Sequence, residues 1–157
     1  MKLTVLAVGK VKKKHFAAGC SDYLGRLPRY TPIDVVEIKD EPVKGGRSPD
    51  QIRGREAERI RARIPKGALV FALDERGDTP TSKSLATQLG RIRDQGRREV
   101  AFIIGGPLGL EPALRAECDH LLALSAFTLP HELARLVLLE QLYRAFTILA
   151  GEPYHNS

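Results

Sequence analysis

Histidines are the residues of this chain best suited to moving a proton, because the ordinary pKa of histidine lies close to neutral pH. His155 follows Tyr154 in a Pro-Tyr-His sequence near the carboxyl terminus, so a proton acceptor lies beside an aromatic ring that could orient a substrate. His131 opens a long apolar segment. The alternative is that the terminal pair belongs to a solvent-exposed tail and that His131 only begins a helix. His15 and His120 have no neighbours in the sequence that suggest chemistry.

A glycine-rich turn follows an apolar run in the segment 102–112, FIIGGPLGLEP. A phosphate-binding P-loop would need a lysine followed by serine or threonine, and this segment has neither. A dinucleotide-binding turn would need the spacing GxGxxG after the first strand, and this turn follows the fourth apolar run. We therefore predict a turn at a strand end, where missing side chains let another group approach the backbone. The alternative is that the glycines only permit a tight turn.

These residues must be positioned by strands and helices, and the sequence pattern predicts an alternation of the two. Short apolar runs predict strands at 3–8, 33–38, 68–73, 100–104 and 121–124. Apolar residues at helical spacing predict helices at 16–27, 112–118 and 130–150. Two further helices are predicted to begin after the capping residues Ser48 and Ser82. We therefore expect one α/β domain over residues 1–157, with a mostly parallel sheet and helices on both faces.

In open α/β sheets, ligands bind beyond the carboxyl ends of the strands. Three strand ends stand out on this criterion: Leu73 with Asp74, Gly105 with Gly106, and the loop 124–129. The loop has the sequence LSAFTL, and an apolar loop of small residues suits a flat heterocycle held by backbone hydrogen bonds. We predict a binding site where these three strand ends meet.

The composition indicates a folded protein with a basic surface. The 157 residues include 25 Lys and Arg against 19 Asp and Glu, a formal net charge of +6 that favours a polyanionic partner. Cys20 and Cys118 lie far apart without metal-ligand spacing, so we expect neither a disulfide framework nor a metal site. The apolar start is too short for a signal peptide, and no run is long enough for a membrane span. We expect a cytoplasmic protein.

Basic residues gather in two places. Lys10, Lys12, Lys13 and Lys14 follow the first predicted strand, and we expect this cluster to contact phosphate. The second group lies in the loop and helix after the second strand: Lys44, Arg47, Arg53, Arg55, Arg59, Arg61 and Arg63. Because Glu56 and Glu58 interrupt that group, we expect part of it to form ion pairs within the fold.

Several segments together resemble one known family. The opening LTVLAVGK, the turn IGGPLGL, the segment LSAFTLPHELARLVLLEQLYRA and the terminal PYHNS resemble the RlmH family of SPOUT-class rRNA methyltransferases over the whole chain. The resemblance implies a SPOUT fold with a C-terminal trefoil knot, S-adenosylmethionine as the methyl donor and a homodimer. It implies methylation of ring nitrogen 3 of a pseudouridine in 23S rRNA of assembled ribosomes.

The resemblance also implies roles for particular residues. It places the cofactor against the strand ends already selected, at Leu73, Gly105 and the residues Leu124, Ser125, Ala126, Phe127, Thr128 and Leu129. It also favours His155 and Tyr154 as catalytic residues. Apart from the resemblance, His131 is a catalytic candidate because it adjoins the loop 124–129. Arg144 on the last helix is a further candidate that could contact RNA phosphate, the alternative being a solvated charge.

The last predicted helix, 130–150, is apolar on more than one face, which fits a subunit interface as well as contact with the sheet. Across such an interface, the tail of one subunit could complete the pocket of the other. Two other functions stay open at this point: a non-catalytic RNA-binding or ribosome-binding factor, and an α/β enzyme for a small acidic metabolite.

Overall fold

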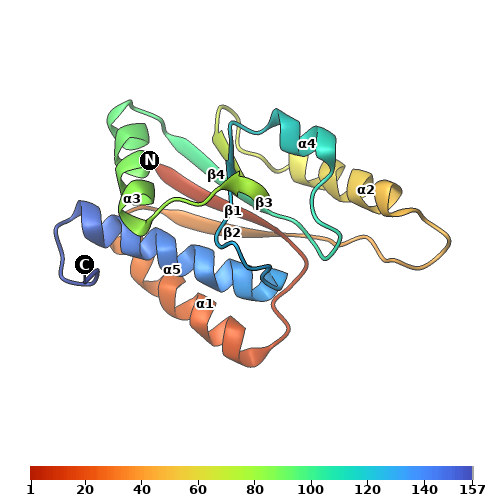
Figure 1. The fold of residues 1–157 in the computed structure, drawn as a ribbon, viewed down its shortest axis with the longest axis horizontal. Helices are drawn as coiled ribbons and strands as arrows, with labels where there is room; N and C mark the ends of the chain where they lie inside the picture. The colour runs from red at the N-terminus through yellow and green to blue at the C-terminus, as the bar shows by residue number, and fades with distance from the viewer. Residues whose placement is uncertain (157) are drawn as a thin grey trace.

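A single sheet of five parallel strands forms the centre of the computed structural model, which describes residues 1–156 (Figure 1). The strands are ordered β2-β1-β4-β3-β5 across the sheet. Their bounds are β1 (Lys2–Val8), β2 (Ile33–Ile38), β3 (Leu69–Asp78), β4 (Glu99–Ile104) and β5 (His120–Leu122). All neighbouring pairs are parallel, so the carboxyl ends of the strands lie along one edge.

Helices cover both faces of the sheet, as the alternating pattern predicts. Their bounds are α1 (Lys14–Arg26), α2 (Pro49–Arg61), α3 (Ser82–Asp94), α4 (Pro112–Glu117) and α5 (His131–Leu149), with a short 3-10 turn at Leu27–Arg29. The helices α1, α3 and α5 pack on one face, and α2 and α4 pack on the other (Figure 1). Within residues 1–156, no helix is long and apolar enough to cross a membrane.

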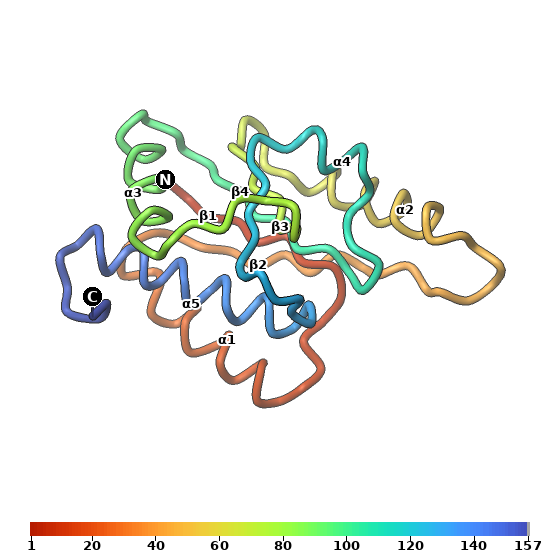
Figure 2. The backbone as a smooth tube through the Cα atoms, viewed as in Figure 1, coloured from red at the N-terminus to blue at the C-terminus, as the bar shows by residue number. Residues whose placement is uncertain are grey.

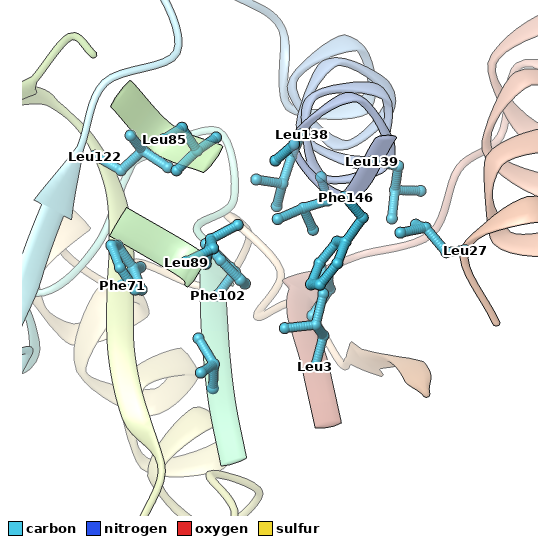
Figure 3. Packing of buried hydrophobic residues seen from close by; sticks show 14 of the residues in the cluster. Leu3, Leu27, Phe71, Leu85, Leu89, Phe102, Leu122, Leu138, Leu139 and Phe146 are labelled. Atoms are coloured by element: carbon cyan, nitrogen blue, oxygen red, sulfur yellow. The ribbon is translucent and has the colours of Figure 1, made fainter. Parts of the chain in front are cut away.

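The alternating side chains of β1 explain why this strand reads as a continuous apolar run. Leu3 and Val5 point into the core beneath α1, α3 and α5, whereas Leu6 and Val8 point into the core beneath α2 and α4. In the first core, α5 lays its buried leucines and Phe146 over the sheet (Figure 3). Each such side chain contributes about 1.5–3 kcal/mol when it is fully buried.

Helix starts follow the cap signals with one exception. Ser48 and Gln51 form the expected capping box at the start of α2, each side chain bonding the other residue's backbone N–H. The prediction that Ser82 caps α3 is wrong, because Thr81 takes that position. The Thr81 hydroxyl accepts from the backbone N–H of Ser84 at 3.1 Å, and Ser82 becomes the first helical residue.

Strand β3 is longer than the predicted 68–73, since it continues to Asp78 and returns to β5. Leu122 of β5 pairs with both Leu73 and Asp78 of β3, which are five positions apart, so the register shifts at an irregularity of β3 between these two residues. The backbone N–H of Ala123 then donates to the Asp78 carbonyl at 2.8 Å. The connection to α3 thus crosses the chain that leaves β5 (Figure 2). The trefoil knot itself stays a prediction.

Gly77 is the residue that permits this crossing. A Cβ atom there would lie 2.5 Å from the carbonyl carbon of Leu121, and backbone cannot move aside as a flexible side chain can. We therefore expect Gly77→Ala to lower the free energy of unfolding by about 3 kcal/mol, the cost of overpacking a closed site. Gly25→Ala in α1 is the matched control: its Cβ meets nothing within 4 Å, and the change should add up to about 1 kcal/mol of helix stability. Urea unfolding of both variants tests this, and equal midpoints would contradict it.

Candidate active site

A cavity of about 850 Å³ lies at the carboxyl ends of β3, β4 and β5. Leu73 lines it from β3, and Gly105 lines it from the turn after β4. The loop after β5 supplies a third wall through Leu124, Ser125, Phe127, Thr128 and Leu129. Of the eight positions expected to hold the cofactor, only Ala126 is not a lining residue; it is exposed.

The glycine turn packs against itself as well as lining the cavity. The Gly109 N–H donates to the Gly106 carbonyl at 2.9 Å, and Gly109 takes a φ of 78°, which favours glycine. A Cβ on Gly105 would lie 3.0 Å from the carbonyl carbon of Gly109 and 3.1 Å from the side chain of Leu110. The space that a side chain at position 105 would need is therefore occupied by Gly109 and Leu110 of the same turn. These contacts support the tight-turn interpretation, and the approach of a ligand to the backbone of the turn stays a prediction.

The loop 124–129 holds its shape through a local bond and brings His131 to the cavity. The Ser125 hydroxyl accepts from the backbone N–H of Phe127 at 2.9 Å. The Phe127 side chain lines the cavity yet is 84% exposed. His131, the first residue of α5, lines the same cavity, so the structure brings this predicted catalytic residue together with the predicted cofactor residues.

A charged group in the cavity wall was not predicted as functional. The Asp74 carboxylate, only 8% exposed, pairs with Arg115 of α4 at 3.3 Å and with Arg76 at 3.2 Å. All three residues line the cavity. The sequence marked Asp74 only as part of the strand end at Leu73 and gave its carboxylate no role. Arg115 carries no local signal, because only the packing of α4 brings it to the cavity.

The other predicted catalytic residues form a separate cluster at the far end of α5. Arg144 donates to Glu140 and lies 3.3 Å from Nδ1 of His155. Its guanidinium sits 4.7 Å from the ring centroid of Tyr154, in the geometry of a cation–π contact. The Tyr154 hydroxyl donates to Glu140 at 3.1 Å and lies 3.2 Å from the hydroxyl of Tyr23. The tail is therefore held against α1 and α5.

The cluster and the cavity do not meet within one chain. His131 is the first residue of α5 and Arg144 comes 13 positions later, a separation of about 20 Å along a helix. The structure thus brings His131 to the cavity and leaves Arg144, Tyr154 and His155 outside it.

Two tyrosines of this tail region have raised pKa values. Burial, together with the bonds to Tyr23 and Glu140, holds the pKa of Tyr154 well above its ordinary range. The bond that Tyr30 donates to Glu152 is the main cause that raises the pKa of Tyr30 to about 12. Both phenols therefore carry their protons at neutral pH, and Tyr154 acts there as a hydrogen-bond donor rather than as a base.

Alkaline pH should weaken the fold through these phenols. Because the folded pKa of Tyr30 lies above the unfolded value of 10.0, its contribution is complete below about pH 10 and is lost as the pH rises towards 12. Tyr30→Phe should be less stable than the unchanged protein at about pH 9, and the difference should narrow by about pH 11. Urea unfolding of both proteins at the two pH values measures this difference in the free energy of unfolding. A difference that stays constant with pH would contradict the assignment.

Comparisons with known proteins identify the family of the chain. The family described as predicted SPOUT methyltransferase matches residues 1–155. A ribosomal RNA large subunit methyltransferase H of Geobacter metallireducens is 45% identical over 157 residues, which is all of both chains. The protein of the same name from Bordetella petrii is 47% identical, again over all of both chains.

Solved structures show the fold at much lower sequence identity. A probable methyltransferase of Bordetella pertussis superposes with a TM-score of 0.57 at 15% identity, covering 92% of this chain and 95% of that one. A probable methylase family protein of Haemophilus influenzae gives a TM-score of 0.55 at 12% identity, covering 99% of this chain and 70% of that one. The family match over nearly the whole sequence and the full-length relatives establish that the chain belongs to the SPOUT methyltransferase family.

Proposed function

We propose that the chain transfers the methyl group of S-adenosylmethionine to ring nitrogen 3 of a pseudouridine in 23S rRNA of assembled ribosomes. The observation that carries this is the meeting of Leu73, Gly105 and the loop 124–129 around one cavity. The full-length relatives named as large-subunit rRNA methyltransferases support the substrate class. Such a substrate places the protein in the cytoplasm.

The cavity fits S-adenosylmethionine in size and chemistry. A volume of about 850 Å³ lies within the range of small-molecule sites. Leu73, Leu124 and Leu129 give apolar walls for a heterocycle, and the backbone of the glycine turn and loop offers hydrogen-bonding groups. The charged side chains of Asp74 and Arg115 suit a ligand that also has a polar, ionised part. When bound, the cofactor supplies an electrophilic methyl group.

The protein's own contribution is to position two reactants and to accept a proton. Holding the acceptor nitrogen in line with the methyl group can supply much of the rate enhancement without covalent chemistry. The ring nitrogen must lose its proton, and His131 is a histidine already at the cavity. Tyr154 keeps its own proton at neutral pH, so it is not the proton acceptor, and its aromatic ring is suited to orienting the target ring. His155 is the second candidate for the proton acceptor.

A homodimer would unite the two groups of catalytic candidates. Leu133 and Val137 lie one turn apart on α5 and stay partly exposed, outside the cores that pack on the sheet. A twofold pairing through this face sets the two α5 helices against each other. With the helices antiparallel, the tail cluster of one copy lies near the cavity of the other. The crossing at Gly77 is what a C-terminal knot at this cavity requires, and it supports the expected SPOUT knot.

Labelled S-adenosylmethionine tests the function directly. The protein is incubated with ribosomes that lack the modification, with separated subunits and with free rRNA. We expect label in 23S rRNA of whole ribosomes. Cofactor binding with label only in small metabolites would favour the metabolite enzyme. Ribosome binding without cofactor binding in calorimetry would favour the non-catalytic factor.

Gly105 offers a sharper test of the cavity. A Cβ at this position must displace the backbone of Gly109, which moves the turn that lines the cavity. We expect Gly105→Ala to weaken S-adenosylmethionine binding at least about tenfold, which corresponds to about 1.4 kcal/mol. Gly54→Ala in α2 is the control, because its Cβ would make only an ordinary contact of 3.5 Å with Glu111. Equal affinities of the two variants in calorimetry would argue against a cofactor at this turn.

A further inference from the structure

The loop between β1 and α1, residues 9–13, presents three exposed lysines, and we name it the lysine loop. Lys10, Lys12 and Lys13 form no ion pair with an acidic side chain anywhere in residues 1–156. Lys13 only approaches the ring of Phe16, with its Nζ 5.9 Å from the ring centroid. Three ammonium groups are therefore free to bind an anion.

The second basic group, in α2 and the loop before it, is mostly paired. Arg47 and Arg59 both pair with the buried carboxylate of Glu41, and Arg61 pairs with Glu111 and Glu117. Ion pairs within the fold are thus present as expected, but those of residues 1–156 do not involve Glu56 or Glu58, the carboxylates that suggested them. The shorter run of basic residues is therefore the better candidate for binding an anion.

The first turn of α5 holds the lysine loop at both of its ends. At one end, Nη2 of Arg135 donates to the carbonyl of Gly9 at 3.0 Å. At the other end, Oε1 of Glu132 accepts from the backbone N–H groups of Lys12 at 2.7 Å and Lys13 at 3.1 Å. Glu132 and Arg135 lie three positions apart, so they share one face of the helix.

Glu132 fixes the backbone just before α1. Lys13 occupies the N-cap position and makes no side-chain cap bond. The carboxylate of Glu132 accepts from the N–H of Lys13, one of the backbone donors that a helix start leaves unpaired, and from the N–H of Lys12 before it. The N–H bond from Lys13 is the main cause that lowers the pKa of Glu132, so this carboxylate stays ionised at neutral pH. Because it binds the backbone, the lysine side chains remain free.

The same turn of α5 borders the cavity. His131 and Ala134 line the cavity, and Glu132 between them faces the lysine loop instead. The loop also follows the carboxyl end of β1, and β1 pairs in parallel with β4, whose carboxyl end leads into the cavity wall. The start of α5 thus contacts both the cavity and the lysine loop. Figure 1 shows the connection from β1 to α1 beside this end of α5.

We propose that the lysine loop binds phosphates of the RNA segment that carries the target nucleotide, and that Glu132 and Arg135 are positioning residues that hold the loop at the mouth of the cavity. This rests on the proposed function and adds to it the surface on which the RNA backbone lies. Compact ammonium groups next to a cavity suit phosphates, which recognise charge without reading sequence.

Removal of the lysines is the first test, with a matched set of cations removed elsewhere. One variant carries Lys10→Ala, Lys12→Ala and Lys13→Ala. The control carries Lys66→Ala, Arg97→Ala and Arg98→Ala, three exposed cations at the opposite edge, before β3 and β4. Methylation of unmodified ribosomes is measured at several salt concentrations, and ribosome binding is measured by co-sedimentation without the reaction.

The lysine variant should raise KM for ribosomes, leave kcat and cofactor affinity unchanged, and lower the slope of log binding constant against log salt by about 2. The control should match the unchanged protein in all of these. Equal salt slopes for the two variants would overturn the proposal. If the unchanged protein neither binds the cofactor nor methylates, the proposed function fails, and co-sedimentation still decides whether the lysine loop binds RNA.

Glu132 tests the positioning role. Glu132→Ala removes the bonds to the N–H groups of Lys12 and Lys13 and should raise KM for ribosomes about fivefold, comparable to losing one hydrogen-bonding group at a helix start. Glu132→Gln keeps an oxygen that can accept, so it should recover most of the loss. Cofactor affinity should stay within about twofold for both variants if the fold is intact. A lower kcat with unchanged KM would show that Glu132 acts in the chemistry instead, and would overturn its assigned role.

Discussion

The double pairing of β5 with β3 is the constraint on which the site depends. Leu122 meets β3 at Leu73 and again at Asp78, so the chain between these positions must arch over the strand end. That arch leaves β5 only one direction in which to continue, with the Ala123 N–H fixed on the Asp78 carbonyl. The loop 124–129 therefore emerges beside Leu73 and opposite the turn at Gly105. Without the arch, three strand ends would share an edge but would not enclose a cavity.

The sequence predicted the parts of the site that local pattern determines. Buried parallel strands read as continuous apolar runs, and their ends identify the edge where ligands bind, so Leu73, Gly105 and the loop 124–129 could be selected together. The extension of β3 to Asp78 could not be predicted, because the residues after Leu73 are charged and become a strand only by pairing with β5. Arg115 was missed for the same reason: a contact between distant segments leaves no periodic signal.

Net charge indicated a polyanionic partner but could not show which cations are free. Burying a carboxylate such as that of Glu41 favours surrounding it with guanidinium groups, and α2 and the loop before it supply them. Those arginines compensate the buried charge of Glu41, and each Arg–Glu ion pair also lowers the positive potential at that surface. The carboxylate of Glu132 beside the lysine loop is bound to backbone N–H groups rather than to the lysine side chains. Counting all basic residues along the chain would predict the anion-binding surface at α2. Counting only those without an ion pair predicts it at the lysine loop.

The rigidity of α5 sets what one copy of the chain can do. A helix of 19 residues keeps its two ends apart, and the tail that follows it turns back onto Tyr23, Glu140 and Arg144. Bringing Tyr154 to the cavity of its own chain would require breaking these bonds. It would also expose the Tyr154 ring, whose centroid lies 4.8 Å from that of Tyr143. In the proposed dimer, two α5 helices pair about a twofold axis and the tail of one copy reaches the cavity of the other. This arrangement would leave the bonds of the tail within its own chain intact, which favours the proposed dimer as the way to unite His131 with Tyr154 and His155.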